Sequence, residues 1–337
     1  MASSTIRDVA RAADVSVASV SRVLNDHANV HPDTRERVRA AISALGYVPH
    51  AGARSLSLAR TQAIGVVLPD LHGEFFSEIV RGMDRAVTPA GYHLLLSNMH
   101  ADAELAAQAM RTMRGRVDGL IVMAPHLTAD ALEAALPRGL PTVMLNTVPS
   151  GDRAGIRVDN AAGIRAAVAH LAATGRRAPV HIAGPVGNVD AVARRDAFAA
   201  AMRDHFPDAP VRIVAGDFFE ESGTAAVAAL VAQGTPFDAI VAANDMMAFG
   251  ALQALRDAGR QVPEQVAVTG FDDVPLARYL GLTTAHVPLV DMGSRAIERL
   301  LALISPGVTS GTRGAHDPDL IIPELIVRRS SGAPETL

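Results

Sequence analysis

The sequence predicts an α/β protein in which a small all-α headpiece precedes a two-lobed, doubly wound core. Three observations lead to that prediction. Two short helical patterns joined by a tight turn lie near the N-terminus, a third follows, and an alternation of apolar strands with helices begins near Thr61. The alternation runs through two series, which indicates two lobes with parallel sheets. We therefore predict a headpiece at 1–48, a linker at 49–60, a core at 61–330 and a frayed tail at 331–337.

Charge is distributed unevenly along the 337 residues, whose net charge is −4. Residues 1–60 hold eight arginines against five acidic residues, whereas the remainder holds 23 basic and 30 acidic ones, so only the N-terminal segment suits binding to phosphates. The absence of cysteine excludes disulfides, thiolate chemistry and cysteine-ligated zinc, and we expect no metal or other cofactor. No apolar run has the length of a membrane span and the N-terminus lacks a signal-peptide core, so we expect a cytoplasmic, nucleoid-associated protein with no membrane partner.

The first two helices form the pattern around which the chain is organised. Thr5 is placed to cap a first helix, with Asp8 at the capping-box position, and Ser16 is placed to cap the helix that follows. Only two residues remain between the helices for a turn, which is typical of a helix-turn-helix.

The second helix, within DVSVASVSRVLN, has two distinct faces. Val20, Val23 and Leu24 recur at helical spacing and predict a buried stripe. Small, hydrogen-bonding and basic side chains fall on the other side, namely Val17, Ala18, Ser21 and Arg22. That outward face suits the base edges and thymine methyl groups of a DNA major groove, although short helical hairpins of this composition also occur in ordinary bundles.

A third helix and a linker complete the N-terminal segment. Pro32 stands in the first turn of the helix and Gly46 ends it, while Val38, Ile42 and Leu45 are expected to supply its buried face. Its arginines at 35, 37 and 39 are expected on the outer, solvated side. The linker PHAGARSLSLAR is a poor isolated helix, and its composition is that of a flexible tether.

The core is predicted from repeated strand–helix units. We expect strands at 63–68, 93–97, 119–122, 141–145, 179–182, 211–214, 239–242 and 267–270, and helices at 75–90, 103–113, 127–136, 161–173, 192–205, 222–233, 246–258 and 292–304. The stretch DLIIPELIVRRSSG supplies late strands. Because no long linker separates the two series, several chain crossovers are expected to connect the lobes.

Candidate ligand-binding residues stand just after several of these strands, where ligands bind in open α/β sheets. Polar groups that match hydroxyls and rings that can stack follow the strands: Asp70, Phe76, Asn146, Arg194, Phe218, Asn244 and Asp272. Asp245 and Asp273 have the alternative of being helix caps, and Phe75 is equally consistent with a core position.

The stretch TIRDVARAADVSVASVSRVLN closely resembles the N-terminus of the lac-repressor/galactose-repressor (LacI/GalR) family of bacterial transcription regulators, and the resemblance continues through most of the chain. It implies a DNA operator as partner and a homodimer that binds it as a palindrome. The DNA contacts that it implies are Thr5, Ser16, Val17, Ala18, Ser19, Ser21, Arg22, Asn25 and Thr34 in the headpiece, and Ala53, Arg54 and Leu56 in the linker. In such proteins the linker folds into a hinge helix on DNA, and a leucine at the position of Leu56 enters the central base step.

The same resemblance implies a core like the periplasmic sugar-binding proteins, closing on a small-molecule effector. Arg194, Asn244 and Asp272 match recurring effector-contact positions, whereas Phe76, Asn146 and Phe218 match positions that vary with the effector. We expect a repressor of carbohydrate-utilisation genes, with a sugar effector favoured. A purine corepressor is the alternative, because GDFFEESG around Phe218 resembles the purine-repressor branch.

Two other classes of function are disfavoured. An uptake binding protein is opposed by the helix-turn-helix and the missing signal peptide. An enzyme is opposed by the lack of a nucleophile elbow, a phosphate-binding P-loop, a zinc-protease motif or a well-placed carboxylate pair.

Overall fold

The computed structural model describes residues 4–25, 27, 29–48, 60–100, 102–148, 153–305 and 319–332. The chain divides into two compact units, Met1–Thr61 and Gln62–Leu337, which are described separately. The linker positions Ala53, Arg54 and Leu56 lie outside the described residues.

The N-terminal unit contains α1 (Ile6–Ala12), α2 (Val17–Leu24) and α3 (Pro32–Leu45). The predicted caps are confirmed, because Thr5 and Asp8 form a complete capping box and the Ser16 hydroxyl accepts from Ser19 N. Asp14, in the turn between α1 and α2, has a φ of +49°, a conformation that aspartate tolerates better than most residues. Small side chains make the core of this unit: Val9, Val20, Val23, Val38 and Ala41.

One prediction for α3 is wrong. Leu45 is 37% exposed, because the helix ends there and Ala41 and Tyr47 pack against the core in its place. Arg35 lies on the outer side as expected, and its Nη2 donates to the carbonyl oxygen of His27 at 2.8 Å, which ties α3 to the preceding segment.

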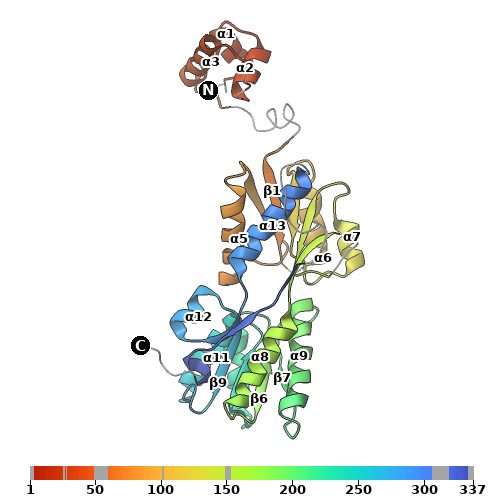
Figure 1. Ribbon diagram of the computed structural model, residues 1–337, viewed down its shortest axis with the longest axis vertical. Helices are drawn as coiled ribbons and strands as arrows, with labels where there is room; N and C mark the ends of the chain where they lie inside the picture. The colour runs from red at the N-terminus through yellow and green to blue at the C-terminus, as the bar shows by residue number, and fades with distance from the viewer. Residues whose placement is uncertain are drawn as a thin grey trace. The chain divides into compact units, whose positions relative to one another are not determined.

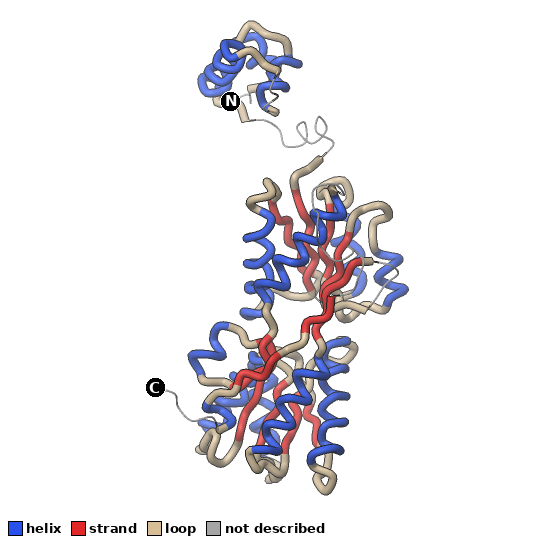
Figure 2. Tube along the Cα trace, viewed as in Figure 1, coloured by secondary structure: helices blue, strands red, loops and turns tan. Residues whose placement is uncertain are grey.

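The C-terminal unit consists of two lobes, each built on a six-stranded sheet (Figures 1 and 2). The N-lobe sheet has the order β11-β5-β4-β3-β1-β2, and every pairing in it is parallel. Its strands are β1 (Ala63–Leu68), β2 (His93–Asn98), β3 (Gly119–Val122), β4 (Thr142–Leu145), β5 (Ala154–Val158) and β11 (Asp319–Ile321). The helices of this lobe are α5 (Gly73–Val87), α6 (Ala103–Met113), α7 (Ala129–Ala135) and α13 (Leu289–Ile304).

The C-lobe sheet has the order β12-β10-β9-β8-β6-β7, parallel except where β12 joins β10. Its strands are β6 (Pro179–Ile182), β7 (Arg212–Val214), β8 (Ala239–Ala242), β9 (Ala267–Asp272), β10 (Thr283–His286) and β12 (Glu324–Ile326). The helices are α8 (Asn160–Ala173), α9 (Val189–His205), α10 (Glu220–Ala232), α11 (Asp245–Asp257), α12 (Pro275–Leu280) and the 3-10 turn η1 (Arg329–Ser331).

The chain crosses between the lobes three times, from β5 to α8, from β10 to α13 and from β11 to β12. The predicted two-lobed parallel architecture with several crossovers is therefore confirmed. The sequence missed β5, α12 and β10. The strand β10 reads TTAH, and both of its threonines are buried with hydrogen-bond partners. Ser330 and Ser331 bond Thr283, and the Thr284 hydroxyl donates to Asp245 Oδ1.

Each lobe contains one pair of helices that pack closely against each other at glycine residues. A Cβ at Gly82 of α5 would lie 1.9 Å from the carbonyl oxygen of Val290, and one at Gly293 of α13 would lie 2.1 Å from that of Ile79. In the C-lobe, Gly223 of α10 and Gly250 of α11 approach each other's helix backbone as closely. Only glycine permits such contact, so a closely packed helix pair stands beside the sheet in each lobe.

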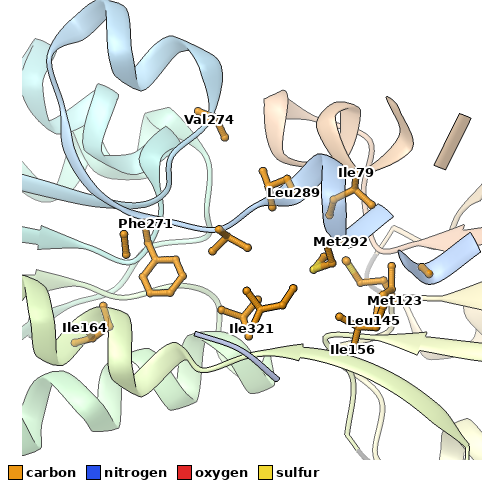
Figure 3. Packing of buried hydrophobic residues seen from close by; sticks show 14 of the residues in the cluster. Ile79, Met123, Leu145, Ile156, Ile164, Phe271, Val274, Leu289, Met292 and Ile321 are labelled. Atoms are coloured by element: carbon orange, nitrogen blue, oxygen red, sulfur yellow. The ribbon is translucent and has the colours of Figure 1, made fainter. Parts of the chain in front are cut away.

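One apolar cluster spans the crossovers (Figure 3). Ile79 and Met292 contribute from the N-lobe, Phe271 from the C-lobe, and Leu289 and Ile321 from the crossing segments. Continuous packing through the crossovers means that the two lobes share one hydrophobic core.

The end of the described chain is packed onto the C-lobe. Ser331, which the sequence places in a frayed tail, is fully buried and lies 2.8 Å from His170 Nε2 and 2.6 Å from Thr283 Oγ1. Among the described residues, no helix combines the length and apolar character that crossing a membrane requires.

Candidate functional site

A cavity of about 480 Å³ lies between the lobes, at the carboxyl ends of the strands. Six of the seven ligand-binding residues expected from the sequence line it. Two belong to the N-lobe, Asp70 and Phe76, and four to the C-lobe: Arg194, Phe218, Asn244 and Asp272. A cleft of this size with an apolar wall and a few buried polar groups has the properties of a small-molecule site.

Arg194, on α9, is the centre of the polar network in this cavity. It is only 3% exposed, its Nε donates to Asn160 Oδ1 at 2.7 Å, and its Nη1 donates to the Ala243 carbonyl oxygen at 2.5 Å. Its Nη2 lies 3.6 Å from Asp272 Oδ1, and its guanidinium carbon stands 3.7 Å from the centroid of the Phe271 ring. Fixed from several sides, this guanidinium is held in one orientation.

Asp272 ends β9 and is 4% exposed. Its Oδ1 is buried and accepts no hydrogen bond within the described structure, although Arg194 lies nearby. Burial raises the pKa of Asp272 to about 7; Arg194 opposes the shift and Asp190 adds to it. A hydroxyl donor on a ligand would satisfy that oxygen, because buried acceptors without partners are costly.

The backbone at the C-lobe side is held in unusual conformations. Phe218 has a φ of +77° and Asp272 a φ of +111°. The Phe218 ring lies against Gly184, where a Cβ would be 2.5 Å from the ring, and the Phe218 carbonyl oxygen accepts from Asn244 Nδ2 at 2.9 Å. Asn244 also caps α11 through its Oδ1, so one side chain fixes both a helix start and the loop that carries the ring.

Asn146 is the one expected ligand residue that does not line the cavity. It follows β4 with a φ of +41°, is 3% exposed, and its backbone N–H donates to the Ile156 carbonyl oxygen. Position after a strand predicted it as a contact, but the residue is buried beside the cavity lining rather than in it, and its Oδ1 has no hydrogen-bond partner within the described structure.

The N-lobe side is built from an Asx turn and rings. Asp70 Oδ1 accepts from the N–H groups of Leu71 and His72 at 2.6 and 3.1 Å, so part of this carboxylate serves its own loop. Phe75 and Phe76 follow on α5 in an edge-to-face pair, 5.1 Å apart, and both line the cavity. Phe75 is thus a cleft residue that also packs on the core.

Several lining residues were not expected from the sequence, namely His72, His100, Met123, His126, Asn188, Asp190, Asp217, Phe219 and Met246. A signal did exist for two of them. Asn188 follows β6 and caps α9, and Asp190 lies in the first turn of that helix, which is the same strand-to-helix position that identified Asn244.

Contacts between the lobes surround the cavity. His72 Nε2 lies 3.2 Å from Glu220 Oε2, Leu276 N donates to Glu74 Oε2 at 2.9 Å, and Val189 N donates to the Pro125 carbonyl oxygen at 3.0 Å. These bonds join residues of opposite lobes, so rotation of one lobe would break them.

Asp245 and Asp273 are neither helix caps nor lining residues of this cleft. Asp245 is fully buried, accepting from Val274 N and the Thr284 hydroxyl, and burial raises its pKa well above the usual value. Asp273 bonds His286 at 2.9 Å and Arg328 at 2.7 Å. Both hold β9 and its following loop in place behind Asp272.

A second candidate surface lies on α2 of the headpiece. Val17, Ala18 and Arg22 are exposed, whereas Ser19 and Ser21 are partly buried. Thr5 and Ser16 stand at the starts of α1 and α2, Asn25 ends α2, and Thr34 lies in the first turn of α3. An apolar side chain, a small one and an arginine are thus presented together on one short helix.

Metal binding finds no support within the described ranges, where no group of three histidine, aspartate or glutamate side chains could hold an ion.

Comparisons with known proteins agree with this arrangement. Residues 5–50 match the family described as bacterial regulatory proteins, lacI family, and residues 168–331 match the one described as periplasmic binding protein-like domain. The HTH-type transcriptional regulator GalS of Salmonella typhimurium is 35% identical over 331 residues, covering 97% of this chain and 96% of that protein. The ribose operon repressor of Escherichia coli is 36% identical over 310 residues, covering 89% and 93%.

The crystal structure of the lac repressor dimer bound to operator and the anti-inducer ONPF is similar to this chain with a TM-score of 0.86 at 28% identity, covering 98% of this chain and 100% of that one. These relatives confirm the family that the N-terminal motif resembled and the fold predicted for the core. They are transcription regulators rather than enzymes. The chain therefore belongs to the LacI family of DNA-binding bacterial transcription regulators.

Proposed function

We propose that this protein is a repressor that binds a palindromic operator as a homodimer. Binding of an effector in the cleft either lowers or raises its affinity for that operator. One observation carries the proposal: a single chain joins an exposed α2 face to a cleft in which the buried Asp272 Oδ1 has no hydrogen-bond donor. The lac repressor structure, solved as a dimer with operator and anti-inducer, supports the same combination here. Such a repressor acts in the cytoplasm on nucleoid DNA.

In this proposal the headpiece at 1–48 recognises the operator. The linker at 49–60 forms a hinge helix, and the core at 61–330 binds the effector and forms the dimer. Thr5, Ser16, Val17, Ala18, Ser19, Ser21, Arg22, Asn25 and Thr34 are the proposed headpiece contacts, and Ala53, Arg54 and Leu56 the proposed hinge contacts. A dimer presents two copies of α2 related by a two-fold axis, so its operator is a near-palindrome.

A dimer surface is available on the N-lobe. The strand β2 ends its sheet, and its Leu95 and Leu96 are 40% and 45% exposed. An edge strand with adjacent exposed leucines is a site where a second copy can pair and remove apolar area from water.

Selection of bound fragments from a random DNA pool tests operator recognition. We expect an enriched near-palindrome and a loss of about 1–3 kcal/mol for Arg22→Ala on that fragment. An equal loss on scrambled DNA would show that Arg22 contacts only phosphates.

We propose that the effector is a sugar. Carboxylate, amide and guanidinium groups beside rings suit hydroxyls on an apolar face, and one relative is named a ribose operon repressor. A purine is the second candidate, favoured by the Phe218 ring, which lines the cavity and offers an aromatic face to a ligand. Thermal denaturation of the full chain with each class distinguishes them, because a ligand at 100 times its Kd adds about 2.7 kcal/mol of stability.

A further inference from the structure

The cleft is unusually rich in acidic groups. Among the described residues that line it, four are aspartates and one is an arginine: Asp70, Asp190, Asp217, Asp272 and Arg194. Asp70 and Asp217 each direct Oδ1 to backbone N–H groups of their own loops. Asp190 and Asp272 have no comparable backbone donors and lie around the arginine.

The charge of Arg194 is already matched. Its Nε is taken by Asn160 and its Nη1 by the Ala243 carbonyl oxygen, while its Nη2 faces Asp272 at 3.6 Å. The amide of Asn160 donates in turn to Asp190 Oδ1 at 2.7 Å. Two carboxylates therefore share one guanidinium, directly at Asp272 and through Asn160 at Asp190.

The histidines of the cleft do not offset this acidity. Burial lowers the pKa of His126, which keeps that ring neutral at neutral pH. His72 stands against Glu220 at 3.2 Å, so any positive charge on it is matched by a carboxylate of the opposite lobe. His100 is exposed, and solvent screens it.

We propose that the cleft selects an effector without a phosphate or carboxylate group, and that Asp190 is the side chain that enforces this selection. The inference rests on the proposed function, because it concerns the ligand of that same cleft. An uncharged polyol brings hydroxyl donors to the unpartnered Asp272 Oδ1. A phosphate ester brings further acceptors toward Asp190 and Asp272 in place of hydroxyl donors. Arg194, the one arginine among the described lining residues, already donates to Asn160 and to the Ala243 carbonyl oxygen.

Asp190 is the member of this group that can be altered without dismantling it. Its Oδ1 acts only as an acceptor toward Asn160, and the oxygen of an asparagine can accept the same bond. Asp190→Asn therefore removes a charge and keeps the shape. Asp204→Asn is the matched control, since it makes the same change at an exposed position of α9.

The first experiment fractionates a metabolite extract of the native host on an anion exchanger at neutral pH. Each fraction is added to the full chain on its selected operator, and the change in operator affinity is measured. We expect activity in the unretained fraction, insensitive to phosphatase. Activity confined to the retained fraction and lost on phosphatase treatment would overturn the inference while leaving the proposed function intact. No activity in any fraction would instead contradict the proposal of a small-molecule effector. The inferred selection against phosphate and carboxylate groups would then be wrong as well.

The second experiment compares the effector purified from the active fraction with its monophosphate ester by calorimetry. We expect the wild-type chain to bind the ester at least 100-fold more weakly than the parent. In Asp190→Asn that ratio should fall at least tenfold, and in Asp204→Asn it should stay unchanged. Asp190→Ser serves the same purpose if the asparagine variant does not fold. An unchanged ratio in a folded Asp190 variant would show that another residue sets the charge preference.

Discussion

The two lobes contribute to the cleft in different ways. The C-lobe offers buried polar side chains that are fixed by hydrogen bonds, with Arg194, Asn244 and Asp272 each at most 7% exposed. The N-lobe offers rings and a loop, in which Phe75 and Phe76 are partly exposed and Asp70 bonds its own backbone. One lobe can therefore recognise the hydroxyl pattern of a ligand, while the other covers it with apolar surface.

This difference does not come from the scaffolds, because both lobes have six-stranded sheets and a helix pair joined by glycines. It comes from the loops that follow the strands. At this edge of the C-lobe sheet, Phe218 and Asp272, the last residue of β9, have positive φ, and Asn244 bonds the Phe218 carbonyl oxygen. Preorganised polar groups lose little entropy on binding, which favours specificity.

Replacing Arg194 is expected to have the largest effect, because it removes the centre of the fixed polar network of the C-lobe. Arg194→Met leaves Asp190 and Asp272 without their shared cation, so we expect the free energy of unfolding to fall by about 3–5 kcal/mol and effector binding to be lost. Urea denaturation followed by circular dichroism measures the change. Arg195→Met, at an exposed position of the same helix, should cost far less. Equal losses in the two variants would contradict a central role for Arg194.

The pH dependence of the free energy of unfolding tests a buried histidine of the C-lobe. His181 is fully buried on β6, its Nδ1 lies 2.7 Å from the Val241 carbonyl oxygen, and burial lowers its pKa to about 4. Because the unfolded chain binds this proton at higher pH than the folded one, stability is complete above about pH 6.5 and falls as the pH drops toward 4, by up to about 3 kcal/mol.

His181→Gln should remove that part of the acid sensitivity. Urea midpoints at pH 7, 5.5 and 4.5 provide the measurement, with the exposed His205→Gln as control. Parallel pH profiles for wild type and His181→Gln would show that the buried histidine carries none of the effect.

Replacing an aromatic ring tests the contribution of the N-lobe to effector binding. Phe76→Ala removes an apolar face from the cleft but no fixed polar group, so we expect effector binding to weaken by about 0.5–1.5 kcal/mol. Titration calorimetry measures it, and Leu105→Ala, exposed on α6, should have no effect on binding. A loss of binding as complete as the one expected for Arg194→Met would contradict the proposed contrast between the lobes.

The contact between His72 and Glu220 should matter least. Their side chains are 53% and 36% exposed, and exposed ion pairs contribute under about 1 kcal/mol. Glu220→Gln should therefore shift the thermal midpoint only slightly, and less in high salt. A large shift that persists in 1 M salt would mean that this pair holds the lobes together.

The sequence by itself determined the headpiece, the two-lobed parallel core and most of the cleft. The caps at Thr5 and Ser16 and the periodicity of Val20 and Val23 are local features. They depend on residues close together in the chain, so the sequence alone predicts them. Asp272, Asn244 and Phe218 were found because the carboxyl ends of parallel strands meet at one edge of a sheet.

Only the tertiary structure decided the rest. Asn146 follows a strand as its counterparts do, yet its turn buries it outside the cavity, and no sequence pattern distinguishes the two outcomes. The sharing of Arg194 by Asp272 and, through Asn160, by Asp190 joins residues far apart in the chain. Charge balance in a cleft depends on which groups come within a few ångströms, and that distance is set by packing rather than by spacing in the sequence.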